Sequence, residues 1–115
     1  MEEKMKHLYL AGPLTHESEE NKFMDNVRNA LNIYVRLIKE GYAPYCPHLS
    51  AFADIVESIG YEDWMDLDFE WLLKCDAVIR LEGESTGADR EVEFAKKHNI
   101  PVFTWYEFRV AEDLL

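Results

Sequence analysis

Residues 77–98 read AVIRLEGESTGADREVEFAKKH, and this stretch decides the fold that we predict for the chain. The apolar run at residues 77–81 suits a buried strand, and residues 87–98 have the composition of a helix. A loop with glycine and serine separates them. A strand, such a loop and a helix N-terminus leave free backbone N–H groups at the edge of a sheet, and these favour an anion.

The helix of residues 87–98 carries one acidic residue on its apolar side. At about 100° per residue, Glu91 falls beside Ala88, Phe94 and Ala95, whereas the other charged residues point the opposite way. Charge on an inward face costs free energy unless it has a partner or a task. Glu91 is therefore either a carboxylate that pairs with a buried donor or reaches water, or a catalytic carboxylate.

Asp68 is a second acidic residue predicted to point inward, from a helix of residues 61–74. The predicted core side of this helix also carries Trp64, Leu67, Trp71, Leu72 and Cys75. The remaining acidic residues of the helix project away from that side. Two interpretations stay open, namely a site carboxylate, or a buried cap or ion-paired group whose partner would be Arg28, Arg36 or Arg80.

The remaining segments alternate between strands and helices. We expect strands at residues 7–11, 42–46 and 102–105, and helices at residues 19–40, 50–58 and 106–115. This alternation predicts an α/β three-layer sandwich with a small parallel sheet, flavodoxin-like and doubly wound, in which residues 1–115 form a single domain. Pro44 indicates an edge strand or a bulge.

Two more segments follow predicted strands, at the edge of the sheet where ligands commonly bind. Right-handed crossovers place the loops after Leu10, Cys46 and Leu81 near one edge of the sheet. Gly12 and Pro13 end the first strand, and His48 follows the second. A histidine in such a place is more often simply hydrogen-bonded than in contact with a ligand.

Composition limits the partners and the compartment. The 115 residues have a formal net charge of −11, so we expect no long nucleic acid, because that affinity comes mainly from Lys and Arg. A small anion needs only a few local donors. Two cysteines without zinc spacing and the lack of a signal-peptide pattern predict a soluble, cytoplasmic protein. No apolar run approaches the ~20 residues of a membrane span.

The aromatic content predicts self-association. Three Trp, six Tyr and six Phe are many for one small core. Aromatic side chains are enriched at subunit interfaces. We therefore expect a homodimer or a higher homo-oligomer. We expect neither a metal nor a cofactor.

Three motifs follow one another along the chain: YLAGPL at residues 9–14, DFEWL at 68–72 followed by Cys75 and Asp76, and STGADRE at 85–91 followed by Ala95 and the sequence IPV at 100–102. In this order and spacing they resemble the nucleoside 2-deoxyribosyltransferase-like superfamily, which includes the 2'-deoxynucleoside 5'-phosphate N-hydrolases. The motifs are similar to the family's opening strand and substrate loop, its Asp-containing helix, and its nucleophile helix with the final strand. The resemblance covers most of the chain.

The resemblance implies roles for individual residues. Glu91 would be the nucleophile, and Asp68 the acid that handles the departing base. Ser85, with backbone N–H groups of the following turn, would contact a 5'-phosphate, and Tyr9 would line the deoxyribose pocket. The substrate-binding set would be Tyr9, Gly12, Pro13, His48, Ser85 and Gly87.

The expected function is cleavage or transfer of an N-glycosidic bond on a (deoxy)nucleoside or its 5'-monophosphate. Glu93 stands where the family often has glycine, and residues 12–16 are closer to the transferase type. Hydrolysis and transfer therefore both stay open. The alternatives are a non-catalytic module that binds a nucleotide or sugar phosphate, and a plain interaction domain of flavodoxin-like topology.

Overall fold

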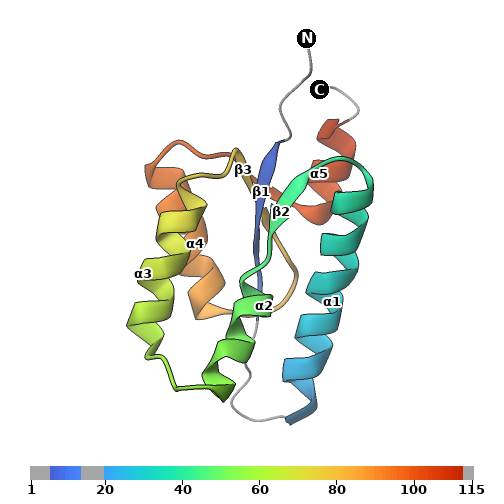
Figure 1. The fold of residues 1–115 in the computed structure, drawn as a ribbon. Coiled ribbons are helices and arrows are strands. Elements are labelled where there is room, and N and C mark those ends of the chain that lie inside the picture. Colours follow the sequence, from blue (N-terminus) through green and yellow to red (C-terminus); the bar gives the residue numbers. More distant parts are fainter. Residues whose placement is uncertain (1–5, 14–19, 113–115) are drawn as a thin grey trace.

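The computed structural model describes residues 6–13 and 20–112, without the side chains of residues 20–22 and 112. Its strands are β1 (His7–Ala11), β2 (Ala43–Tyr45), β3 (Ala77–Arg80) and β4 (Val102–Thr104). Its helices are α1 (Glu20–Lys39), α2 (Pro47–Ser50), the 3-10 helix η1 (Ala51–Ile55), α3 (Tyr61–Leu72), α4 (Thr86–Lys97) and α5 (Trp105–Glu112). Helices α1 and α5 cover one face of the sheet, and α3 and α4 cover the other (Figure 1).

The four strands pair in parallel in the order β2-β1-β3-β4. This arrangement confirms the predicted α/β class with a small parallel sheet. The β2 strand, with Pro44, lies at an edge, as that proline predicts. The chain leaves β1 toward one edge and β3 toward the other. In open α/β sheets, ligands bind outside the carboxyl ends of the strands at such a switch point.

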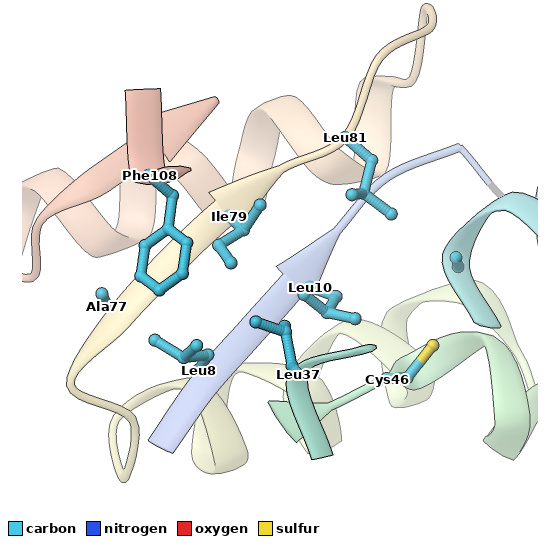
Figure 2. Close-up of a cluster of buried hydrophobic side chains, with 9 residues drawn as sticks. Leu8, Leu10, Leu37, Cys46, Ala77, Ile79, Leu81 and Phe108 are labelled. Atoms are coloured by element: carbon cyan, nitrogen blue, oxygen red, sulfur yellow. The ribbon is translucent and has the colours of Figure 1, made fainter. Parts of the chain in front are cut away.

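Side chains of the central strands alternate between the two faces, because successive residues of a strand point in opposite directions. Leu8 and Leu10 of β1 pack with Leu37 of α1 and Phe108 of α5 (Figure 2). The intervening Tyr9 and Ala11 face α3 and α4. The cluster on that second face consists of Tyr9, Ala11, Leu72, Val78, Ala88 and Ala95. Tyr9 thus lies in the layer between the sheet and α3 and α4.

The inward side of α3 differs from the prediction. Its buried residues are Met65, Asp68 and Leu72. Leu67 and Trp71 were expected in the core, but 42% and 49% of their surfaces are exposed. The helix is rotated so that Met65, at the right spacing before Asp68 and Leu72, packs inward instead. The hydrophobic pattern did not decide this rotation, because α3 carries apolar residues around much of its circumference.

The helix expected at residues 50–58 is also different. The chain turns into α2 already at Pro47, which suits the first helical position because it lacks an N–H group that would need a partner. It then tightens into η1, which ends at Ile55. Among the described residues, no helix is both long and apolar enough to cross a membrane.

The loops after β1 and β3 pack against each other without space for extra atoms. A Cβ atom on Gly12 would lie 2.8 Å from Cβ of Leu81. On the other side, Gly83 has a φ of +115°, and a Cβ there would lie 2.8 Å from Cγ of Pro13. Two glycines therefore allow these loops to meet.

We predict that Gly12→Ala destabilises the fold by about 1–3 kcal/mol, because the added methyl must displace Leu81. Gly60→Ala is the matched control, since a Cβ on Gly60 meets nothing within 4 Å. Urea unfolding followed by circular dichroism measures both variants. Equal midpoints for the two variants would contradict the packing described for the loops.

Candidate active site

Three polar side chains meet between the sheet and helices α3 and α4. They are Tyr9 on β1, Asp68 on α3 and Glu91 on α4, with 0%, 8% and 5% of their surfaces exposed. The Tyr9 hydroxyl donates a hydrogen bond to Oε2 of Glu91. Asp68 acts on the Tyr9 hydroxyl through its charge. We call these three residues the carboxyl cluster.

The local sequence explains how the two helices bring acids to this point. On α4, Glu91 follows Ala88 by three residues and precedes Ala95 by four, and all three are buried. On α3, Asp68 occupies the same kind of place between Met65 and Leu72. The inward orientation predicted for both acids is confirmed.

The partners of the two acids settle part of what the sequence left open. Glu91 does pair with a buried donor, and that donor is Tyr9. An ion pair of Asp68 with Arg28, Arg36 or Arg80 is wrong, since neither acid makes an ion pair with arginine among the residues that the structure describes.

Burial dominates the electrostatics of the cluster. It raises the pKa of Glu91 to about 8; Asp68 adds to this rise, whereas the Tyr9 hydrogen bond and the charge of Arg80 oppose it. Burial likewise raises the pKa of Asp68 to about 6, against the effect of the nearby Tyr9 hydroxyl. The pKa of Tyr9 is raised well above its usual value by burial and then by Glu91. Burial therefore favours the neutral form of both carboxyl groups.

One atom of the cluster has no partner. Oδ1 of Asp68 is buried and accepts no hydrogen bond from any described residue. Buried acceptors without donors are rare in folded proteins. A ligand that donates a hydrogen bond, such as the ring N–H or amino group of a base, would satisfy this oxygen.

An aromatic stack connects the cluster to the surface. The Tyr9 ring stacks on Tyr45 with their centroids 5.6 Å apart, and Tyr45 stacks on Trp71 at 5.5 Å. Trp71 is half exposed because it covers the outer side of Tyr45 instead of entering the core. The stack fixes the plane of the Tyr9 ring and thereby the direction of its hydroxyl group.

Arg80 braces the loop between β3 and α4, a role that the sequence did not reveal. Its guanidinium donates to the carbonyl oxygen of Leu81, to that of Gly83 at 2.9 Å, and to Oδ1 of Asp89 at 3.2 Å. Its side chain is mostly buried, and its charge acts on Glu91. The sequence feature that could have indicated this role is an arginine at the last position of a strand that is otherwise buried.

Ser85 and Gly87 lie at the start of α4. The Ser85 hydroxyl oxygen accepts a hydrogen bond from the Ala88 backbone N–H at 3.0 Å, which makes Ser85 the N-cap. Its own hydrogen remains available to a ligand. A Cβ on Gly87 would lie 3.6 Å from the Tyr61 hydroxyl and 3.8 Å from the Met65 sulfur, so α4 approaches α3 closely here.

His48 joins the loop after β1 to the segment after β2. Its Nε2 lies 3.0 Å from the Pro13 carbonyl oxygen, and its Nδ1 lies 3.5 Å from Sγ of Cys46. A carbonyl oxygen only accepts, so Nε2 carries the hydrogen and Nδ1 accepts from the thiol. Burial lowers the pKa of His48. The structure thus places His48 as a hydrogen-bonded support of the loop that carries Gly12 and Pro13; residues 14–16 lie outside the described residues.

The carboxyl cluster is nearly closed to solvent. A surface depression of about 430 Å³ lies on the outer side of α3 and α4, but no member of the cluster lines it. It is lined by Phe69, Thr86, Asp89, Arg90, Glu93, Phe94 and Lys97. Among the described residues, no group of three or more His, Cys, Asp or Glu side chains is placed to hold a metal.

The fold and the cluster together define an α/β domain with two buried acids next to a tyrosine of its first strand, which donates a hydrogen bond to one of them. Residues 6–104 match the family described as a domain of unknown function, DUF4406, and the chain belongs to that family. The match runs from β1 to β4 and includes all three residues of the cluster. No curated protein matches the chain.

We predict that Glu91→Gln stabilises the fold increasingly as pH rises. Native Glu91 keeps its proton up to about pH 8, whereas an unfolded glutamic acid loses it at a pH of roughly 4.3. The stability due to this proton is complete below the unfolded pKa and is lost as pH rises through the folded one. The glutamine stays neutral throughout.

The difference in melting temperature between Glu91→Gln and the wild type should therefore grow by at least ~4 °C from pH 5 to 8.5, which corresponds to about 1 kcal/mol in a domain of this size. Glu93→Gln, on the exposed side of the same helix, is the control and should show no such trend. A pH-independent difference for Glu91→Gln would show that the carboxyl group is ionised in the native protein.

Proposed function

We propose that this protein cleaves or transfers the N-glycosidic bond of a (deoxy)nucleoside or its 5'-monophosphate. The observation that carries the proposal is the pair of buried carboxyl groups beside the Tyr9 hydroxyl, which donates a hydrogen bond to Glu91. Pairs of carboxyl groups are the usual machinery of glycosidic bond cleavage. The resemblance of the three motifs to deoxyribosyltransferases supports the choice of an N-glycosidic substrate.

In this proposal Glu91 attacks C1' of the sugar, and Asp68 protonates or hydrogen-bonds the base as it leaves. Water or a second base then resolves the glycosyl-enzyme. A retaining double displacement needs carboxyl groups roughly 5 Å apart.

The start of α4 would bind the phosphate of a substrate, and the burial of Glu91 limits the access of its sugar to the cluster. The Ser85 hydroxyl group and the first N–H groups of the helix would receive a 5'-phosphate. Because only 5% of Glu91 is exposed, the border of the cluster must open when the sugar enters. Two free cysteines, one of them buried, fit a reducing compartment, so we place the reaction in the cytoplasm.

The test is release of free base from a panel of deoxynucleosides and their 5'-monophosphates. We expect the wild type to release base from at least one of them, and Glu91→Gln to lower the rate at least about a thousandfold. Glu93→Gln is again the control and should keep the wild-type rate. Turnover by Glu91→Gln at the wild-type rate would refute the nucleophile assignment; stabilisation by a nucleotide without base release would favour the binding module.

We also propose that two copies associate through the apolar surface of residues 49–61. Each copy carries a net charge of −11, so contact requires a surface with few acids. This segment has only Asp54 and Glu57, and Ile55 and Val56 are 81% and 91% exposed. Its exposed apolar residues are Leu49, Phe52, Ile55, Val56, Ile59 and Tyr61.

Light scattering should therefore give twice the mass of the chain for the wild type and the mass of one chain for Val56→Glu. Val110→Glu is the control, because Val110 is also half exposed but lies on α5, at the end of the molecule away from α2 (Figure 1). A monomeric wild type, or a dimer that survives Val56→Glu, would remove this surface as the interface.

A further inference from the structure

Helix α3 has a second apolar row, which the core does not cover. Trp64, Leu67 and Trp71 recur at spacings of three and four, so at about 100° per residue they share one side of the helix. This side lies next to the inward side that carries Asp68, and Leu67 and Trp71 are nearly half exposed on it. Trp71 stacks on Tyr45 of β2, the strand at the edge of the sheet. The row therefore faces out beside this edge.

Helix α1 also has a second apolar row. Its members recur at spacings of seven, four and three and are Met24, Leu31, Val35 and Ile38, of which all but Leu31 are about half exposed. In Figure 1, α1 runs upward to the right of the sheet, and β2 lies toward the reader. A right-handed helix in this position turns the row toward the reader, to the side of β2. Helices α1 and α3 thus each present an apolar row at the same edge.

Strand pairing does not cover the open edge of β2. Ala43 donates its backbone N–H to the carbonyl oxygen of Lys6 at 2.9 Å, so its backbone groups face the neighbouring strand β1. Backbone groups alternate in direction along a strand, and those of Pro44 therefore face outward. Proline has no N–H, so this three-residue strand lacks the donor that an added strand would need. Contact at this edge is left to side chains of the flanking elements.

The segment of residues 49–61 joins the two rows into one surface. It lies between α1 and α3 (Figure 1), its Phe52 contacts Phe23 of α1, and it leads directly into α3. We call the two rows and this segment the β2-edge face. Among the described residues, all exposed large hydrophobic side chains except Leu73, Tyr106 and Val110 lie on it. At about 100 Å² for a half-exposed side chain of this size, the face exceeds the ~300–600 Å² of the largest apolar patch on a typical monomer.

The charge of the molecule indicates that the partner of this face is a second copy. The chain has a formal net charge of −11, so a cationic partner would bind its acidic remainder, and an anionic membrane would repel it. The two rows contain no acid, and the segment between them contains only Asp54 and Glu57. Two copies therefore meet through this face while their acidic surfaces stay apart. Soluble oligomers are most often two-fold dimers, in which one patch pairs with itself.

We propose that a second copy covers the whole β2-edge face and that the carboxyl cluster depends on this contact. The inference deepens the dimer of the proposed function and rests on it. Trp71 connects the face to the cluster, because it stacks on Tyr45 at 5.5 Å and Tyr45 stacks on Tyr9 at 5.6 Å. The partner covers the side of Trp71 that the stack leaves exposed. It thereby fixes the rings that orient the Tyr9 hydroxyl toward Glu91, so Trp71 is a positioning residue.

Light scattering tests the extent of the face. Leu67→Glu on α3 and Ile38→Glu on α1 should each give the mass of one chain, because each buries an unpaired charge in the contact. Leu73→Glu is the matched control: Leu73 is 43% exposed against 42% for Leu67, but lies ~240° further around the helix. It should keep twice the mass. Dimers from both Leu67→Glu and Ile38→Glu, or a monomeric wild type, would overturn the proposal.

Tryptophan fluorescence tests whether the partner covers Trp71, and it needs only the wild type and one conservative variant. Dilution of the wild type should move the emission to longer wavelength as the mass falls to that of one chain, because Trp71 then returns to water. Trp71→Phe should remove most of this shift. An emission that stays constant while the mass halves would show that Trp71 lies outside the contact and would overturn the proposal.

Base release tests the dependence of the cluster on the partner. Leu67→Glu leaves the stack itself unchanged, yet it should lower kcat at least about tenfold with a smaller change in KM, whereas Leu73→Glu should keep the wild-type kcat. Monomers of Leu67→Glu with the wild-type kcat would overturn the dependence. Base release by dimers that survive both Leu67→Glu and Ile38→Glu would remove the face and keep the proposed reaction. Loss of the dimer in both variants, without base release from the wild type, would do the opposite.

Discussion

The hydrogen bond from Tyr9 to the buried Glu91 is the interaction on which the remaining structure depends. It joins the first strand to α4, beside the buried Asp68 of α3, inside a layer that otherwise holds apolar side chains. A carboxyl group in such a layer is tolerated when it is neutral or well paired. The position of β1 in the middle of the sheet, the rotation of α3 and the close approach of α4 at Gly87 all serve to bring these partners together.

The sequence predicted the inward-facing residues of an element correctly where its hydrophobic periodicity allowed only one orientation. The alternation of β1 and the apolar face of α4 predicted which residues point inward, Glu91 included. The pattern of α3 allowed more than one rotation, so it placed Asp68 correctly but Leu67 and Trp71 wrongly. Periodicity also cannot name a partner. Nothing in the strand pattern of Tyr9 distinguishes a core ring from a hydroxyl group that binds a buried acid, and the assignment needs the distance between β1 and α4.

The loops at the carboxyl ends of the strands behave as one assembly. Gly12 packs on Leu81, Pro13 packs on Gly83, and His48 binds the carbonyl group of Pro13. The prediction that these loops gather at one edge followed from right-handed crossovers. The close packing of these loops could not be predicted in this way, because it depends on contacts between residues some 70 positions apart. The topological switch point between β1 and β3 is thus closed by packing contacts on the side where a nucleotide would bind.

The stack of Trp71, Tyr45 and Tyr9 has a consequence for spectroscopy. Its rings are separated by 5.5 and 5.6 Å, and its outer member is half exposed. Light absorbed by a tyrosine passes efficiently to an indole at such separations, and a charge near a phenol quenches its emission. We therefore expect ultraviolet light absorbed by the buried ring of Tyr9 to be emitted by the indole of Trp71 at the surface.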